Sequence, residues 1–316
     1  MQKIWRGTTH KTQSFRLSKV TLILGLLALA PFSSSALAQS CPPADYSKPS
    51  LVELHQNKWE IKNDKKRQET ALSLLPCLAS PDPQLRDEIA FEALSFWMRN
   101  KLLDTISIRQ IEQQLLKQLA DTKPAANADF GKPFAALTLA EVSRVDRLQA
   151  FMSDEERKAM VDAAVQYLST ITDYRGFDEK EGWRHGVAHA ADWMLQLALN
   201  PQISVEQHQQ ILNALATQIK TEKHFYTYGE PERLMAPVFF IAMRSKLDDA
   251  AWKTWFDALQ QGSPSANQGN TQAAMARRHN LKAFLQAFYV NVQESKQEHI
   301  KERLLPLIIS SLKKLN

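Results

Sequence analysis

Glycine is scarce in this sequence, with 9 in 316 residues, or about 3% against a usual ~7%. Folds rich in sheet need glycine at many tight turns, so the low count favours helices, and no run of strict apolar–polar alternation predicts a strand. Only 2 cysteines are present, which excludes a disulfide-dense scaffold. The hydrophobic fraction of 44% and the charged fraction of 23% exclude a disordered or collagen-like chain.

The sequence also lacks an apolar run as long as the ~20 residues that span a bilayer. The run from Val20 to Ala30 has 11 residues. Five basic residues and no acidic one precede it, and the small-x-small sequence Ala36-Leu37-Ala38 follows it. This order predicts a secretory signal peptide over residues 1–38, export to the periplasm, and no transmembrane segment after cleavage. An uncleaved anchor is the alternative.

An excess of positive charge is missing once this segment is removed. The full sequence has 39 basic and 34 acidic residues, and the five basic residues of the segment leave 34 of each sign in residues 39–316. Surfaces that bind nucleic-acid phosphates concentrate Lys and Arg. The balance therefore predicts no nucleic-acid partner.

The two cysteines, Cys41 and Cys77, both lie near the start of the predicted mature chain. In an exported protein this predicts one disulfide, which ties the new N-terminus to the first helices. Lipidation of Cys41, which would anchor the protein to a membrane, is the alternative. The bulky, polar Gln39 fits a lipoprotein signal poorly, so the disulfide is favoured.

Helix signals recur along the rest of the chain. Asp82 followed by Pro83 is typical of a helix start, and apolar residues such as Leu281, Phe284 and Phe288 repeat with helical period. Capping-box spacing, in which a hydroxyl and an acid or amide satisfy each other's backbone donors, occurs at Ser50–Glu53, Ser153–Glu156 and Ser204–Gln207. We predict an all-α fold of ten to twelve helices of ~10–20 residues. Short links between them favour an α-solenoid-like array of antiparallel helix pairs in a single domain over residues 39–316.

Three of the seven glycines after residue 38 fall close together, at Gly176, Gly182 and Gly186. They belong to the string D-Y-R-G-F at 173–177 and the string G-W-R-H-G-V-A-H-A-A-D at 182–192. On these strings, supported by residues 83–88, 229–234 and 280–285, the chain resembles the bacterial domain-of-unknown-function family 2785 over about residues 80–292. The resemblance implies an all-helical domain with no established activity.

A helix from about Gly182 to Leu199 would place His185, His189 and Asp192 on one face and Trp183 on the opposite side. One hypothesis is a divalent-metal site with these three ligands, because Zn²⁺ favours imidazole and carboxylate groups. Water bound to such a metal would make the protein a metal-dependent hydrolase. Gly186 stands where the H-E-x-x-H motif has its catalytic Glu, so that motif is not met. No other cofactor is expected, and the sequence leaves open whether the chain is an enzyme.

The leading hypothesis is a groove around residues 173–192 that binds an unknown ligand or a protein partner. The candidate binding residues are Arg175, Trp183, His185, His189, Asp192, Tyr228, Glu230 and Arg233. Structural alternatives stay open for several of them. The two histidines and Asp192 could form a polar seam between helices. Glu230 and Arg233 could form an i, i+3 surface ion pair, and Arg175 could bridge to Asp173.

Overall fold

Helices account for nearly all regular structure in the computed structural model, which describes residues 40–121, 130–262 and 271–315. The predicted signal peptide at 1–38 lies outside the described residues. The described α-helices are α1 (Lys48–Gln56), α2 (Asp64–Ser73), α3 (Glu92–Arg99), α4 (Thr105–Ala120), α5 (Gly131–Leu148), α6 (Asp154–Thr170), α7 (Gly186–Ala198), α8 (Val205–Ile219), α9 (Glu230–Arg244), α10 (Asp249–Gln260), α11 (Gln272–Gln293) and α12 (Glu298–Leu315). A 3₁₀ helix, η1 (Leu75–Ala79), and a π-helix, η2 (Gln84–Phe91), connect α2 to α3.

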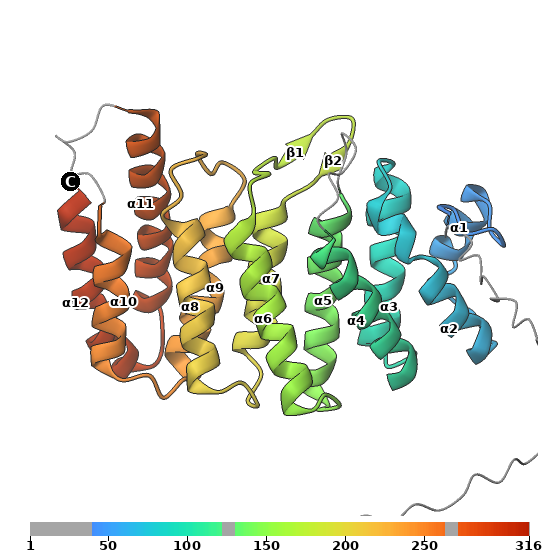
Figure 1. Cartoon of the computed structure of the whole chain (residues 1–316), viewed down its shortest axis with the longest axis horizontal. Helices are drawn as coiled ribbons and strands as arrows, with labels where there is room; N and C mark the ends of the chain where they lie inside the picture. Colours follow the sequence, from blue (N-terminus) through green and yellow to red (C-terminus); the bar gives the residue numbers. More distant parts are fainter. Residues whose placement is uncertain (1–39, 122–129, 263–270, 316) are drawn as a thin grey trace, which may run out of the picture. The chain divides into compact units, whose positions relative to one another are not determined.

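The helices pack in two layers. In one layer α5 packs against α7, α7 against α9, and α9 against α11; in the other α6 packs against α8, α8 against α10, and α10 against α12. Contacts of α4 with α5, α6 with α7, and α8 with α9 join the layers. Consecutive helices from α5 to α9 run in opposite directions (Figure 1). The predicted all-α array of antiparallel helix pairs is therefore confirmed.

Most predicted helix starts are confirmed, and one is wrong. Both the Ser153–Glu156 and Ser204–Gln207 capping boxes form. The first helix instead begins at Lys48, with a capping box between Ser47 and Ser50. Proline lacks a backbone N–H and is tolerated only in the first turn of a helix. Pro49 therefore sets the start of α1 ahead of Ser50.

The predicted disulfide between Cys41 and Cys77 is confirmed, with the two Cα atoms 5.0 Å apart. Cys77 belongs to η1 and is fully buried in the core. The bond engages the Cys41 sulfur that lipidation would require. It joins the start of the described chain to the first helices, as the sequence predicts.

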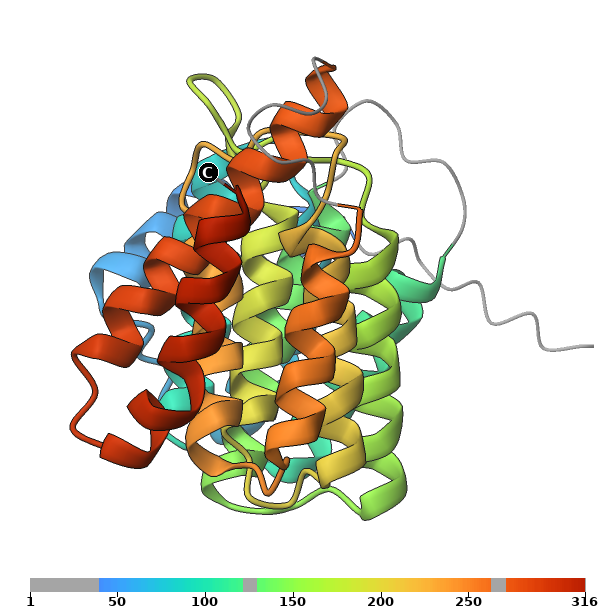
Figure 2. The ribbon, with the colours of Figure 1, turned by 90° about the vertical axis from the view of Figure 1, so that its left-hand side faces the viewer.

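A short β-hairpin corrects the expectation that no sheet would form. Strand β1 (Phe177–Asp178) pairs antiparallel with β2 (Gly182–Trp183). Strands of two residues are too short to show an alternating pattern, so the sequence gives no sign of them. The hairpin extends beyond the ends of α6 and α7 (Figures 1 and 2). Because the chain is in a strand at Trp183, α7 begins at Gly186 and not near Gly182.

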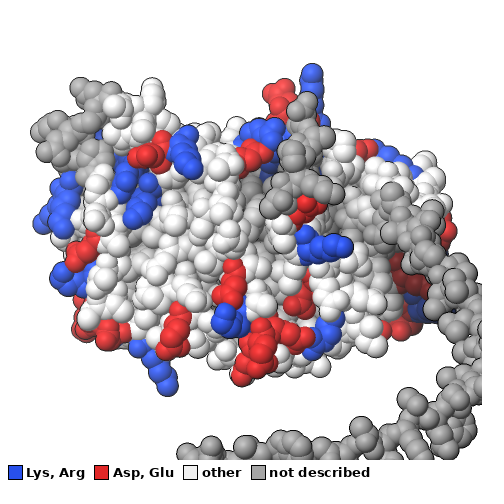
Figure 3. All heavy atoms as spheres, in the orientation of Figure 1, with Lys and Arg blue, Asp and Glu red and all other residues white. Residues whose placement is uncertain are grey.

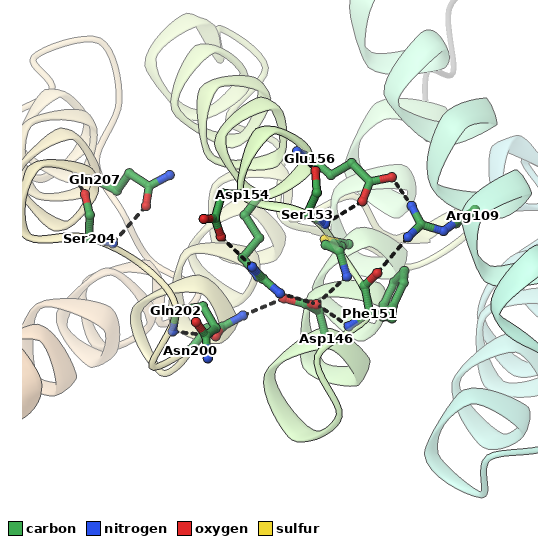
Figure 4. Close-up of polar contacts among 12 residues, drawn as sticks. Arg109, Asp146, Phe151, Ser153, Asp154, Glu156, Asn200, Gln202, Ser204 and Gln207 are labelled. Carbon is green, nitrogen blue, oxygen red and sulfur yellow. Dashed lines mark hydrogen bonds and ion pairs between the residues drawn. The ribbon is translucent and has the colours of Figure 1, made fainter.

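A buried carboxylate fixes the other end of the same helices. Asp146 in α5 accepts hydrogen bonds from the backbone N–H groups of Phe151 and Met152, both at 2.9 Å. It also accepts from Arg157 Nε in α6 and from Asn200 Nδ2 just after α7, both at 2.8 Å (Figure 4). Burial alone would raise the pKa of Asp146, but these donors hold it below its usual value. The carboxylate thus ties α5, α6 and the turn after α7 together.

Among the described residues, no helix is long and apolar enough to cross a membrane. Their charges are mixed on the face drawn in Figure 3, where Lys and Arg lie beside Asp and Glu near the margins and the middle carries little charge. On this face the described residues therefore form no extended field of one sign.

Candidate functional site

Four of the side chains around the hairpin form an aromatic cluster, made of Phe177, Trp183, His185 and Tyr228. The indole of Trp183 stacks on His185 with ring centroids 4.7 Å apart, and it meets Tyr228 edge-on at 5.7 Å. Phe177 lies 5.1 Å from Trp183. Phe177, Trp183 and Tyr228 are 47%, 39% and 41% exposed, so three large rings of the cluster face solvent together.

Gly176 is what allows this cluster to close. A Cβ atom at position 176 would lie 2.1 Å from the ring of Tyr228, a distance that side chains do not tolerate. The Tyr228 ring therefore packs directly on the backbone that leads into β1. The glycine-rich string that stood out in the sequence serves this close approach.

His185 adopts the left-handed conformation, with φ 52° and ψ 38°, at the residue before α7. Its Nε2 is buried without a hydrogen-bond partner and lies 3.8 Å from Oε1 of Glu230. Burial lowers the pKa of His185, and the nearby Glu230 carboxylate opposes that shift. The prediction that His185 shares a helical face with His189 is wrong, because α7 starts one residue later.

Glu230 corrects a second expectation. Its side chain is buried rather than on the surface, and its Oε2 accepts a hydrogen bond from the backbone N–H of Tyr228 at 2.9 Å. It does not pair with Arg233. Arg233 instead reaches from α9 to α7, where its Nε donates to Oδ1 of Asp192 at 2.7 Å and its Nη2 contacts Oδ2. The carboxylate turns inward because it satisfies a backbone donor at the start of α9.

His189 and Asp192 lie on α7 but in different surroundings. His189 is buried against Phe134 of α5, with ring centroids 5.1 Å apart, and burial lowers its pKa to about 3. Burial raises the pKa of Asp192, although Arg233 opposes the shift. The polar-seam interpretation describes these two residues: both sit at contacts between α7 and its neighbours.

The predicted metal ligands do not assemble into a metal centre. Within residues 40–121, 130–262 and 271–315, no group of three or more His, Cys, Asp or Glu side chains could hold a metal ion. Asp192 is engaged by a guanidinium, His189 packs against a phenyl ring, and His185 lies outside the helix. The hydrolase hypothesis is therefore left without a ligand set in this part of the chain.

Arg175 bridges to Asp173, as the structural alternative predicted. Its Nε lies 2.8 Å from Oδ1 and 3.0 Å from Oδ2 of Asp173. Burial raises the pKa of Asp173, but the hydrogen bonds from Arg175 outweigh that effect and leave the pKa below its usual value. The pair stiffens the loop between α6 and the hairpin.

A cleft of about 590 Å³ opens beside this loop. It lies among α4, α5, α6 and residues 171–173, and Gly186 forms part of its wall. Its described lining is Leu116, Leu119, Ala120, Lys132, Pro133, Ala163, Gln166, Tyr167, Thr170, Ile171, Thr172, Asp173 and Gly186. None of the eight candidate binding residues is in this lining. The cleft reaches Asp173 and Gly186, but its walls are not the residues that the sequence analysis named.

One sequence signal could have located these walls. The core-facing stripe of α6 includes Val161, Ala164 and Leu168, all buried. Ala163 and Tyr167 form a second small apolar stripe, one turn apart and only half-buried. A helix with apolar residues on two faces has two surfaces to cover, and in α6 the second one faces the cleft.

Arg86 in η2 is a further residue whose position the sequence could not specify. Its side chain is fully buried, pairs with Asp87, and stacks over the ring of Phe130 at 3.8 Å. Its Nη2 donates to the backbone carbonyl of Glu181 in the hairpin at 2.7 Å. Residues 95 positions apart are thereby joined, and the hairpin is held against the end of the helical array.

The model of the family described as "Protein of unknown function (DUF2785)" matches residues 115–290. The match runs from the end of α4 to α11 and includes the cleft and the aromatic cluster. No curated protein and no solved structure matches the chain.

Proposed function

The chain belongs to the DUF2785 family of proteins of unknown function, and we propose that it is an exported binding protein whose cleft takes a small ligand with an apolar body. The proposal rests on one observation, the cleft of about 590 Å³ beside residues 171–173. Sites for small molecules have volumes of roughly 300–1,000 Å³, mostly apolar walls and a few polar groups. The cleft meets all three conditions.

The walls of the cleft suit such a ligand in detail. Leu116 and Leu119 of α4 and Ile171 just after α6 offer apolar contact in the lining. Tyr167 and Asp173 supply polar groups at the same cleft. The Arg175–Asp173 pair holds the loop that carries Asp173, so this polar group is fixed before a ligand enters.

Export is part of this proposal. The basic segment, apolar run and small-x-small site at residues 1–38 have the order of a signal peptide. The Cys41–Cys77 disulfide supports the same conclusion, because disulfides persist mainly in oxidising compartments such as the periplasm. We therefore propose that residues 39–316 act in the periplasm as a single domain.

Filling the cleft should abolish ligand binding without unfolding the protein. Ala163 lines the cleft and is half-buried, so Ala163→Trp places an indole in the ligand's space. We expect the neutral fluorescent probe 1-N-phenylnaphthylamine to bind the wild type saturably and to bind this variant at least about tenfold more weakly. The matched control is Ala250→Trp, at an exposed position of α10 away from the cleft. Equal probe affinity in both variants would contradict the proposal.

A second candidate function is favoured by the aromatic cluster. Three partly exposed aromatic rings lie together, and the Asp192–Arg233 pair lies on the neighbouring helices. Trp, Tyr and Arg dominate the binding energy of protein interfaces, and grouped exposed apolar side chains mark interaction sites. We propose that the candidate residues Trp183, His185 and Tyr228 form a contact surface for a protein partner.

This contact should be detectable by site-specific crosslinking. A photo-reactive phenylalanine analogue at position 183 is expected to give a discrete crosslinked protein in intact cells. The same analogue at Val290, an equally apolar position of α11 that is 57% exposed, should give none. Identical adducts at both positions, or none at 183, would remove the aromatic cluster as a partner surface.

A further inference from the structure

A second cavity, of about 450 Å³, lies away from the cleft, where α7 and α9 end and α8 begins. Among the residues that line it are Asn200, Ser204, His208, Arg244 and Lys246. Asp146 fixes one wall, because its carboxylate holds Asn200, whose Oδ1 in turn accepts from the N–H of Gln202 (Figure 4). Hydrogen bonds therefore hold the turn after α7, which forms this wall of the cavity, in place.

His208 is the first observation that points to a ligand. Its side chain comes from the first turns of α8, is 5% exposed and lines the cavity. Neither ring nitrogen has a partner at hydrogen-bonding distance and angle within the described residues. Burial lowers the pKa of His208, and the backbone carbonyl of Ala198 lies near enough to the ring to oppose that shift without completing a hydrogen bond. Buried polar groups in folded proteins almost always have a partner, so a ligand that accepts from this ring would satisfy it.

Charge is the second observation. Arg244 and Lys246 both line the cavity, and no acidic side chain is among the described residues of its lining. Neither cation forms an ion pair in the described part of the chain, although Arg244 Nη1 is anchored on the carbonyl of Leu199 at 2.9 Å. The nearby carboxylate of Asp146 is already neutralised by Arg157. The cavity thus has a net positive lining.

We propose that this cavity binds a small oxyanion, either free phosphate or the phosphate group of a larger molecule. Arginine, lysine and a histidine N–H are the donors that phosphate oxygens prefer, and charge-assisted hydrogen bonds are the strong ones. The cavity lies at the start of α8, whose dipole also favours an anion. This site shares no described lining residue with the cleft, so it stands whether or not the cleft binds a ligand.

Titration calorimetry with inorganic phosphate at low ionic strength tests the proposal on the disulfide-bonded mature protein. The test variants are the double variant Arg244→Gln/Lys246→Gln and the single variant His208→Phe. The control is the double variant Lys65→Gln/Lys158→Gln, which removes the same charge from exposed lysines of α2 and α6. We expect one-site binding in the wild type, weakened at least about tenfold in the double test variant and roughly fivefold in His208→Phe. The control should stay within about twofold of the wild type, because Lys65 and Lys158 do not line the cavity.

A parallel titration with glycerol 3-phosphate separates the two sources of the anion. Tighter binding of glycerol 3-phosphate identifies a phosphorylated molecule, and tighter binding of inorganic phosphate identifies the free ion. Absence of saturable binding for both anions would overturn the proposal. A control variant that loses as much affinity as the double test variant would overturn it too, since general charge would then explain the binding. If His208→Phe does not fold, the affinity of the Arg244→Gln/Lys246→Gln variant decides the result.

Discussion

Replacing Asp146 by alanine is expected to lower the free energy of unfolding by roughly 3–5 kcal/mol, the cost of breaking a buried charge pair by removing one partner. Asp146 is 1% exposed and accepts hydrogen bonds from two backbone N–H groups, Arg157 and Asn200. Its loss leaves the largely buried guanidinium of Arg157 without its main partner. It also frees the turn after α7, which walls the phosphate cavity.

Urea unfolding at neutral pH measures this effect. The control is Asp162→Ala, which removes a half-exposed carboxylate paired with Lys158 on the surface of α6. Such exposed pairs contribute under about 1 kcal/mol. Similar losses for the two variants would show that the Asp146 network does not bind the helices together. A large loss at Asp146 alone would support it.

The second large effect is a loss of stability in acid caused by His189. In the folded protein burial lowers its pKa to about 3, below the ordinary value of 6.5. Between these values the unfolded chain binds more protons than the folded one, so stability falls as the pH falls. At 1.36 kcal/mol for each pKa unit, His189 costs about 2 kcal/mol between pH 7 and pH 5, and roughly 4–5 kcal/mol in full by pH 3.

His189→Leu should remove this cost, because leucine cannot take up a proton. Stability of the variant relative to the wild type is expected to rise by about 2 kcal/mol between pH 7 and pH 5. His185 and His208 also have lowered pKa values because they are buried, so part of the acid loss remains in the variant. His299→Leu, which removes an exposed imidazole from α12, is the control. A pH profile of His189→Leu parallel to that of the wild type would refute the assignment.

Sequence patterns were sufficient for most features that local chemistry decides, the start of α1 being the exception. The capping boxes at Ser153 and Ser204 form because their partners lie three residues away on the same helix. The Cys41–Cys77 pairing followed from there being only two cysteines in a chain that the sequence predicts to be exported. Helical periodicity likewise predicted the buried stripe of α11, in which Leu281, Phe284 and Phe288 are fully buried.

The sequence failed where contacts between distant residues decide. Arg86 holds the hairpin through the carbonyl of Glu181, and no local pattern encodes a contact of that span. Trp183 is not in the predicted helix because it pairs with Phe177 in the hairpin and packs against the ring of Tyr228. Arg233 in α9 pairs with Asp192 in α7 and not with its near neighbour Glu230. Only the packing of α7 against α9 determines this pairing.

The candidate site shows the same division. The glycine-rich string contributes Asp173 and Gly186 to the cleft and Trp183 to the aromatic cluster. It did not identify the cleft's walls, because these come from three helices that meet only in the folded chain. The spacing of the histidines predicted metal ligands, but His189 packs against Phe134 of α5 in the folded chain.

Native mass spectrometry of the mature protein, purified from periplasmic extract, tests the central claim most directly. The claim is that the cleft beside residues 171–173 holds a small ligand. We predict a small-molecule adduct on the wild type and on Ala250→Trp, and no adduct on Ala163→Trp. An adduct retained equally by both tryptophan variants would place the ligand elsewhere and contradict the claim.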